Sequence, residues 1–456
     1  MCAQPIVVVG GGLAGMAATV ALQSAGQNVQ LLEARKNLGG RAGSFDDPQT
    51  GETLDNCQHV LLGCCTNLLD FYRRIGAADR IDWQSTIHFI DPAGDSFGLW
   101  AVPGLPAPLH LGASFAGFGA LSLSERASLA GAMVEMLRIG PTGRKKLADV
   151  SFGQWLRENE QPDSLIDKFY ELVLISALNE QCRRASAEYA IQVFQDGMLG
   201  HASAYRMGTP VGTLGELYDH LPGESVSLGV RMTGLRFARN RVAGVETADG
   251  FLPADAVVLA MNYPALERWI PPALYQADSR FAGLKNLESV PILGAHLWFD
   301  RPVLRTPHAA LMNGPLQWLF NKPRGDGSTV HGVISAARDW LSIPKEKCLE
   351  LFTEQICRTI PEARDARLLR GVIVIEKRAT FSPLPGINRS RPAQGPPPGG
   401  IENLYLAGDY TRTGWPATME GAVRSGYLAA EAALNSPGQF FVEDLPQQWP
   451  ARLLGP

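Results

Sequence analysis

The sequence predicts an α/β protein that contains a Rossmann-like domain and at least one further domain. Residues 6–9 form a short apolar, β-branched run, the pattern of a strand that is buried on both faces of a parallel sheet. A glycine-rich turn and a helix follow it at once. A second short apolar strand, ending in a Gly-Asp turn, lies near the other end of the chain at residues 403–409. The length of 456 residues also exceeds what one hydrophobic core usually serves, so two domains are expected.

The first 33 residues predict a βαβ unit with a dinucleotide-binding turn. Gly10, Gly12 and Gly15 fill the G-x-G-x-x-G spacing. The first glycine allows a tight turn, the second lets the backbone approach a pyrophosphate, and the third lets the helix pack against the strand. Glu33 ends the second strand, where a carboxylate accepts both ribose hydroxyls and disfavours a 2′-phosphate. The helix is predicted over Leu13–Gly26 and the second strand over Asn28–Glu33.

Two further segments indicate which dinucleotide is bound. In residues 38–43 the glycines expose backbone N–H groups, and Arg41 can bind a pyrophosphate with paired hydrogen bonds. Taken alone, a glycine turn with a solvated arginine explains the same residues. Near the C-terminus, a helix predicted over Met419–Leu434 would direct its N-terminus at a flavin and stabilise negative charge on the reduced ring. Asp409 would bind the ribityl chain or organise the pyrophosphate loop.

Composition excludes several function classes. The net charge of −4 and the absence of a basic run argue against nucleic-acid binding. The seven cysteines show no zinc-ligand spacing, so no metal site is expected and a reducing cytoplasm is the default. The N-terminal apolar run lacks a positive flank and is interrupted by glycines, so it is not predicted to be a signal peptide. No clean apolar stretch is long enough to span a bilayer.

The three glycine-containing elements together resemble the FAD-dependent amine oxidase and phytoene desaturase superfamily. They are the N-terminal GxGxxG, the GGR segment just after Glu33, and the C-terminal LAGD…GWPATMEGA segment. The resemblance covers most of the chain. It implies FAD as the cofactor and a discontinuous, GR2-type FAD-binding domain with an inserted α+β substrate-binding domain. The implied FAD-binding domain comprises residues 1–75, 205–290 and 395–437, the substrate-binding domain 76–204 and 291–394, and the C-terminal tail 438–456.

The resemblance also implies which residues contact FAD. A β-meander is predicted over 224–255, and in the family a valine at its start contacts adenine through the backbone, which corresponds to Val230. A strand predicted over Ala256–Ala260 leads to Met261 beneath the cofactor. The full set of predicted FAD-binding residues is Gly10, Gly12, Leu13, Ala14, Gly15, Glu33, Ala34, Arg35, Gly39, Gly40, Arg41, Ala42, His59, Val230, Met261, Gly408, Asp409, Trp415, Thr418, Met419 and Ala422.

Other segments narrow the resemblance to the isoprenoid branch of the superfamily. Residues 55–67 resemble a D-x-G-x-H-x-x-x-G-x-Y-x-N segment of carotenoid-type desaturases, with departures at Asn56, Cys57 and Cys65. Three segments resemble most closely the hydroxysqualene dehydroxylases of bacterial hopanoid synthesis: the run 56–67, the proline-rich stretch LWAVPGLPAPLHL and the short tail that ends at residues 451–454. This subfamily implies reductive removal of the allylic hydroxyl of hydroxysqualene to give squalene, with FADH2 as the hydride donor.

The implied partners are a long apolar isoprenoid substrate, hydroxysqualene, and an unidentified reductant for the flavin. A phytoene-type carotenoid desaturase is the alternative. A flavin amine oxidase is a weaker alternative, because residues 55–67 and the proline-rich stretch resemble the isoprenoid branch. A cofactor-free isoprenoid-binding protein should have lost the cofactor contacts, yet Glu33, Arg41 and Asp409 are all present.

The candidate catalytic residues are His59, Gln58 and Glu180, and His59 and Glu180 are candidates for the proton donor. His59 has an ordinary pKa of about 6.5, which suits acid–base chemistry, but it could equally pack on the flavin without a chemical role. Gln58 could orient a water or the substrate hydroxyl. Asp55 is expected to hold its own loop, and Glu420 is expected to cap a helix.

The apolar segment 98–120 has two interpretations. It carries Trp100, Leu105 and Leu109 among prolines, so it could contact a membrane surface at the mouth of a substrate tunnel. It could also be a buried flap of the substrate-binding domain. The first interpretation places the protein in the cytoplasm, peripherally on the inner face of the cytoplasmic membrane.

Overall fold

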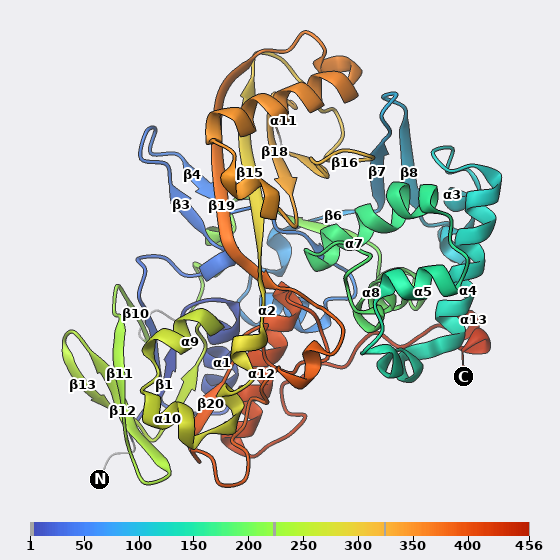
Figure 1. The fold of residues 1–456 in the computed structure, drawn as a ribbon. Coiled ribbons are helices and arrows are strands. Elements are labelled where there is room, and N and C mark those ends of the chain that lie inside the picture. The colour runs from blue at the N-terminus through green and yellow to red at the C-terminus, as the bar shows by residue number, and fades with distance from the viewer. Residues whose placement is uncertain (1–3, 222–224, 323–324, 456) are drawn as a thin grey trace.

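The computed structural model describes residues 4–221, 225–322 and 325–455, and it has two sheet-based bodies joined by long strands (Figure 1). The lower body in Figure 1 holds a five-stranded parallel sheet, and the upper body holds a seven-stranded sheet. A group of helices from the middle of the chain, from α3 (Gly112–Ala116) to α8 (Ala187–Phe194), packs to one side of the upper body.

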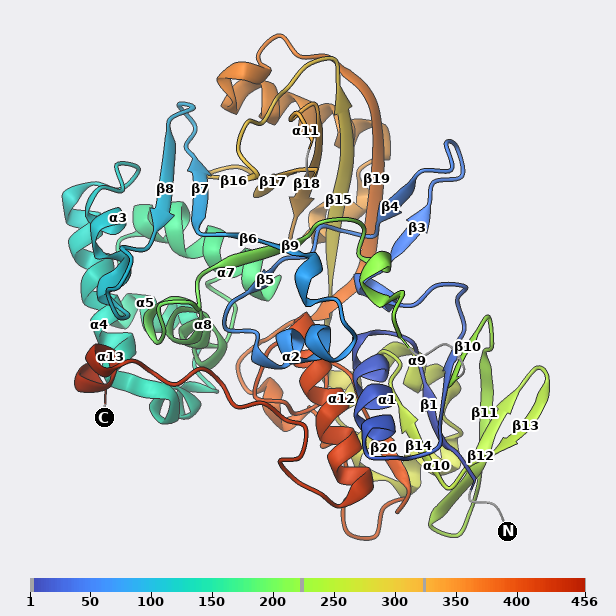
Figure 2. The same cartoon turned by 180° about the vertical axis from the view of Figure 1, so that it is seen from behind.

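The parallel sheet has the strand order β10-β2-β1-β14-β20. Every neighbouring pair in it is parallel, as the apolar runs predict. The helices α1 (Leu13–Ser24) and α12 (Met419–Leu434) pack closely together beside it, as the reverse view shows (Figure 2). The strands are β1 (Ile6–Val9), β2 (Val29–Glu33), β10 (Val226–Leu228), β14 (Ala256–Leu259) and β20 (Leu404–Leu406).

Contact between α1 and α12 depends on a glycine. A Cβ atom at Gly426 would lie 2.3 Å from the carbonyl oxygen of Ala14 and 2.9 Å from the Cβ of Ala17. No larger side chain fits this close approach, so Gly426 joins the C-terminal helix to the N-terminal βαβ unit.

The predicted β-meander is shorter than expected. β11 (Met232–Ala238), β12 (Arg241–Thr247) and β13 (Gly250–Pro253) form a three-stranded antiparallel sheet. β10 does not belong to it, because β10 pairs in parallel with β2 and so extends the nucleotide-binding sheet. Glu224, where the meander was predicted to begin, lies outside the described residues.

The seven-stranded sheet separates a second core from a cavity. One face packs against α11 (Lys345–Thr359), with Leu293, Leu319 and Phe352 in a shared apolar cluster. The other face, which carries Trp318, lines the cavity described below. The order is β19-β15-β18-β17-β16-β7-β8, and the strands are β7 (Thr86–Ile90), β8 (Ser96–Trp100), β15 (Ser289–Phe299), β16 (His308–Leu311), β17 (Trp318–Asn321), β18 (Thr329–Ile334) and β19 (Leu368–Phe381).

The remaining elements lie outside the two large sheets. A small sheet, β5-β9-β6, links strands from both sides of the predicted domain boundaries at 75 and 205. The remaining helices and strands are α2 (Thr66–Arg74), α3 (Gly112–Ala116), α4 (Leu123–Arg144), α5 (Phe152–Glu158), α6 (Asp163–Leu165), α7 (Glu171–Leu178), α8 (Ala187–Phe194), α9 (Tyr263–Trp269), α10 (Pro272–Ala277), α13 (Trp449–Leu454), β3 (Ser44–Asp46), β4 (Thr53–Asp55), β5 (Leu61–Leu62), β6 (Ile81–Gln84) and β9 (Met207–Pro210).

Within the described residues, no helix has the length and hydropathy that crossing a membrane requires. Segment 98–120 is partly buried and partly exposed, so it has features of both the buried flap and the membrane-contact surface. Phe118 is buried, whereas Trp100, Leu105 and Leu109 are exposed.

Candidate functional site

A single cavity of about 810 Å³ brings the motif residues together. It runs from the carboxyl ends of the parallel strands to the inner face of the seven-stranded sheet. Ligands of open α/β sheets bind at the carboxyl ends of their strands. All the predicted FAD-binding residues line this cavity except Gly15.

The glycine loop after β1 shows what each glycine does. Gly10 has φ +114°, a conformation that residues with a side chain rarely adopt. A Cβ at Gly15 would lie 1.8 Å from the carbonyl oxygen of Gly10, so Gly15 permits the contact between α1 and the loop and therefore sits behind the cavity wall. A Cβ at Gly12 would meet no protein atom within 4 Å. The open space in front of Gly12, at the N-terminus of α1, suits a pyrophosphate.

Glu33 lies at the ribose end of the cavity. Its carboxylate accepts hydrogen bonds from the backbone N–H groups of Gly11 (2.6 Å) and Arg35 (2.7 Å). A carboxylate has about four acceptor positions, so capacity remains for ribose hydroxyls. Val230 donates its N–H to the carbonyl of Glu33 (2.9 Å) and lines the cavity beside it. Because the Val230 N–H is already hydrogen-bonded, its carbonyl oxygen is the backbone group that could make the predicted contact with adenine.

Arg41 and Asp409, which are 368 residues apart, form an ion pair at 2.7 Å. Arg41 also donates to the carbonyl of Ala379 (2.6 Å) on β19. Behind Asp409, the buried guanidinium of Arg391 donates to the carbonyl of Asp409 (3.0 Å) and holds the following loop. Arg391 belongs to no motif that was used to interpret the sequence, so sequence reasoning missed it.

The N-terminus of α12 points into the cavity through Thr418, Met419 and Ala422. Thr418 caps this helix, because its hydroxyl accepts a hydrogen bond from the Gly421 N–H (3.0 Å). Glu420 caps a different helix from the one expected. Its fully buried carboxylate accepts from the Asn67 and Leu68 N–H groups (3.1 and 2.8 Å) at the start of α2, and it pairs with Arg424 at 2.7 Å.

The far end of the cavity is lined by apolar side chains from the sheet and the helical group. Ser176 is a polar exception there: its hydroxyl accepts a hydrogen bond from the Trp318 indole N–H (2.6 Å) and donates one to the carbonyl of Leu172 (2.6 Å). These residues come from strands and helices without motifs, so the sequence carried no signal for them beyond hydrophobicity. They are Ile87, Phe89, Leu172, Val173, Ser176, Ile292, Trp318, Phe320 and Val333.

His59 lies on the cavity wall, between the end that is lined by motif residues and the end that is lined by apolar side chains. Its Nδ1 is 2.9 Å from the carbonyl oxygen of Cys57. A carbonyl only accepts, so Nδ1 carries the hydrogen and Nε2 is the free nitrogen of the neutral ring. Burial lowers the pKa of His59 below its ordinary value, and the positive charge of Arg41 lowers it further, against the opposing effects of Cys57 and Asp55. His59 is therefore mainly neutral at pH 7.

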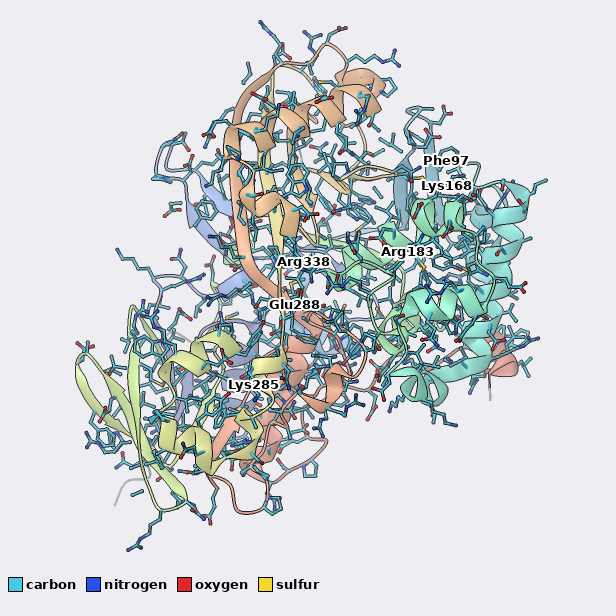
Figure 3. The ribbon with its side chains drawn as sticks, viewed as in Figure 1. Phe97, Lys168, Arg183, Lys285, Glu288 and Arg338 are labelled. Atoms are coloured by element: carbon cyan, nitrogen blue, oxygen red, sulfur yellow. The ribbon has the colours of Figure 1, made fainter. Side chains whose placement is uncertain are left out.

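Glu180 does not line the cavity, so the structure does not favour its predicted role as a proton donor. Its carboxylate is fully buried, accepts a hydrogen bond from Ser382 (2.5 Å) and pairs with Arg338 (2.5 Å). Burial alone would raise the pKa of Glu180, but Arg338 and Ser382 lower it. Figure 3 shows Arg338 beside Glu288, and the two form an ion pair at 2.7 Å. Glu180 thus belongs to an ion-pair cluster at the junction of the two bodies.

Two other polar candidates have different positions. Gln58 lines the cavity next to His59. Asp55 holds its own loop, as expected, because it accepts hydrogen bonds from the Ser44 hydroxyl (2.6 Å) and the Leu214 N–H (2.9 Å).

A glycine loop, the Glu33 carboxylate and two helix N-termini meet at one cavity, which is the arrangement of a dinucleotide-binding protein. The chain belongs to the family of flavin containing amine oxidoreductases, whose model matches residues 13–434. FAD is therefore its cofactor, and the residues around the cavity fit that group. The family also confirms the predicted α/β fold with an FAD-binding domain.

Two similar proteins belong to different enzyme classes. The chain is 28% identical over 439 residues to a hydroxysqualene dehydroxylase from Sinorhizobium fredii, covering 94% of this chain and 98% of that protein. It is 26% identical over 458 residues to a 15-cis-phytoene desaturase from Synechococcus elongatus, covering 94% and 95%. Among solved structures, a double mutant of putrescine oxidase has a TM-score of 0.70 at 16% identity, covering 95% of this chain and 99% of that one.

Replacing Glu33 by Ala should weaken FAD binding without unfolding the protein. A hydrogen bond to a charged acceptor contributes about 1.5–3 kcal/mol, so we expect FAD affinity to fall by about 10-fold to 100-fold. The measurements are the flavin-to-protein ratio after dialysis and the circular dichroism spectrum. Glu246→Ala, on the outer meander and paired only with Arg236 among the ion pairs of the described residues, is the matched control. Unchanged flavin content in the Glu33 variant would remove the ribose assignment.

Proposed function

We propose that the protein is an FAD-dependent hydroxysqualene dehydroxylase, which removes the allylic hydroxyl of hydroxysqualene as water and forms squalene. The observation that carries this proposal is His59. It is an ionisable group with a free Nε2 on the wall of a cavity whose far end is apolar. The relative from Sinorhizobium fredii supports the same reaction. An apolar cavity binds a long isoprenoid through buried area, at about 25 cal/mol per Å².

The chain's own residues would supply positioning and a proton. The apolar side chains of the sheet and α7 hold the polyene and exclude water. The protonated Nε2 of His59 donates its proton to the hydroxyl oxygen, the C–O bond breaks with its electron pair on oxygen, and water leaves. The allylic cation that remains is stabilised by resonance. Reduced FAD, when bound, supplies the hydride that completes squalene.

The direct test is a single turnover. Holoenzyme reduced by light under anaerobic conditions should convert hydroxysqualene to squalene, with about one squalene formed per flavin oxidised. Squalene is measured by gas chromatography and flavin by absorbance. Oxidised holoenzyme with phytoene is the parallel reaction. If phytoene is desaturated while no squalene forms, the protein is a desaturase, and the proposal is wrong.

The role of His59 predicts a pH dependence. Since its pKa lies below 6.5, the protonated acid is lost as pH rises through that pKa. We expect kcat/KM to fall with rising pH, about tenfold per unit above the pKa. His59→Gln should lower the rate by about 10²-fold to 10⁴-fold and flatten the profile.

His220→Gln is the matched control, because His220 is exposed and lies outside the cavity lining. It should keep both the rate and the profile. A profile in His59→Gln that still falls with the same pKa would assign the acid to another group.

We also propose that the protein binds the inner face of the cytoplasmic membrane through an apolar surface made by segment 98–120 and α13. Leu105, Leu109, Trp449 and Leu453 are 41%, 51%, 58% and 75% exposed. Gln448 joins the two parts, because its Oε1 accepts a hydrogen bond from the Ala107 N–H (2.6 Å). The spacing of Trp449 and Leu453, one helical turn apart, was a sequence signal for α13 that went unused.

Serine at Leu109 and Leu453 should weaken binding to lipid vesicles. Burying a leucine contributes about 1.5–3 kcal/mol, so each substitution should reduce vesicle affinity by about tenfold. Co-sedimentation with phosphatidylglycerol–phosphatidylethanolamine vesicles measures it. Leu369→Ser is the control, since Leu369 is also exposed but lies on β19. Equal loss in the control would contradict a specific surface.

A further inference from the structure

Asp196 is a carboxylate on the wall of the cavity that no motif marks. It belongs to a π-helical segment, Gln195–Leu199, which continues α8. Single π turns inside helices are rare and are frequent at functional sites. Most of the cavity lining around it on this helix is apolar, through Val193 and Met198.

The helix of Asp196 contacts both parts of the site where chemistry is expected. One turn before Asp196, Gln192 donates to the carbonyl of Gly414 (3.1 Å), which directly precedes the Trp415 end of the FAD segment. One residue after it, Gly197 faces Leu62, three residues from His59 in the chain. A Cβ at Gly197 would lie 3.7 Å from the Cδ1 of Leu62. Asp196 therefore lines the cavity on a helix that also contacts the Gly414 loop and Leu62.

Arg144 holds the Asp196 carboxylate in one orientation. Its two terminal nitrogens donate to the two carboxylate oxygens, both at 2.8 Å, and one of them also donates to the Gln195 side chain (2.7 Å). The Arg144 side chain is only 9% exposed. It arrives here because α4 breaks at Gly140, where φ is 62° and ψ is 173°. Two irregular helices are thus needed to form the pair.

Stability alone does not explain an ion pair at this position. Removing two charges from water costs free energy, and apolar residues of similar volume often stabilise a protein equally well. A carboxylate offers about four acceptor positions, of which Arg144 uses two. The others are available to a donor in the cavity. The only donor on a hydroxylated isoprenoid is its hydroxyl group.

We propose that Asp196, oriented by Arg144, binds the hydroxyl of the substrate and selects an alcohol over the corresponding hydrocarbon. This inference rests on the proposed function, whose substrate it specifies. The substrate O–H donates to the Asp196 carboxylate, so the lone pairs of the same oxygen stay free to accept the proton from His59. After the C–O bond breaks, the released water keeps the hydrogen bond to Asp196, and both protons of that water are accounted for by the original hydroxyl and His59. Asp196 itself is not protonated.

The test measures binding to the oxidised holoenzyme, where no turnover occurs. Hydroxysqualene and squalene are titrated separately in detergent, and the change in flavin absorbance gives each Kd. Asp196→Asn should weaken hydroxysqualene binding by about tenfold or more, because a hydrogen bond to a charged group is lost, and should change squalene binding by less than about twofold. Glu188→Gln is the matched control, a carboxylate on the same helix that also feels Arg144 but does not line the cavity.

A second variant covers the case in which Asp196→Asn leaves Arg144 buried without a partner and fails to fold. Arg144→Leu combined with Asp196→Leu removes the whole pair, and it should fold, bind squalene at least as well and lose the preference for the alcohol. Equal loss for both ligands, or a preference that persists in the folded double variant, overturns the inference. So does a wild-type protein that binds both ligands equally.

Failure of the proposed function gives a different result. In that case reduced wild-type enzyme forms no squalene, whatever the two Kd values are. The binding preference and the turnover are therefore independent readouts.

Discussion

The parallel pairing of five short strands is the constraint on which the site depends. β1 pairs with β2 and β14, and β14 pairs with β20, all in parallel. Their carboxyl ends consequently meet at one edge of the sheet, although they come from three distant parts of the chain. The pairings Val9↔Leu259 and Leu259↔Leu406 place the loops that begin at Gly10, Ala260 and Ala407 next to one another. The Arg41–Asp409 ion pair and the Gly426 contact depend on this register.

Sequence reasoning succeeded where local chemistry determines local structure. Gly10 has a positive φ, and a Cβ at Gly15 would collide with the Gly10 carbonyl oxygen, so both positions require glycine and their spacing identified the loop. The helix Met419–Leu434 was predicted with its observed bounds. Sequence reasoning failed where pairing between distant segments determines the structure. The strand Val226–Leu228 joined the parallel sheet and not the meander, because its partner is β2, almost 200 residues away. Glu180 was a candidate proton donor from the sequence, but the fold places it in an ion pair with Arg338, 158 residues away in the chain.

The cavity combines two environments that require opposite properties. At the sheet edge, helix N-termini, Arg41 and glycine N–H groups favour negative charge, which suits phosphates and a reduced flavin. At the far end, Trp318 and Phe320 exclude water. His59 lies near the positive groups and out of bulk water, and both effects lower its pKa. The protonated ring is thus scarce at pH 7, but it is a stronger acid than a solvated histidine, which suits a poorly basic leaving hydroxyl.

Overall identity does not decide between a hydroxylated and a purely hydrocarbon substrate, because both kinds of relative match to a similar extent. The apolar lining does not decide either, since hydrophobic contacts barely distinguish an isoprenoid from its alcohol. Discrimination must come from polar groups whose hydrogen bonds remain unpaired when the hydroxyl is missing. On this cavity wall the His59 Nε2 and the Asp196 carboxylate have that property, one able to donate when protonated and the other able only to accept. The first could serve the oxygen of a hydroxyl and the second its hydrogen, because a hydroxyl donates one hydrogen bond and accepts others.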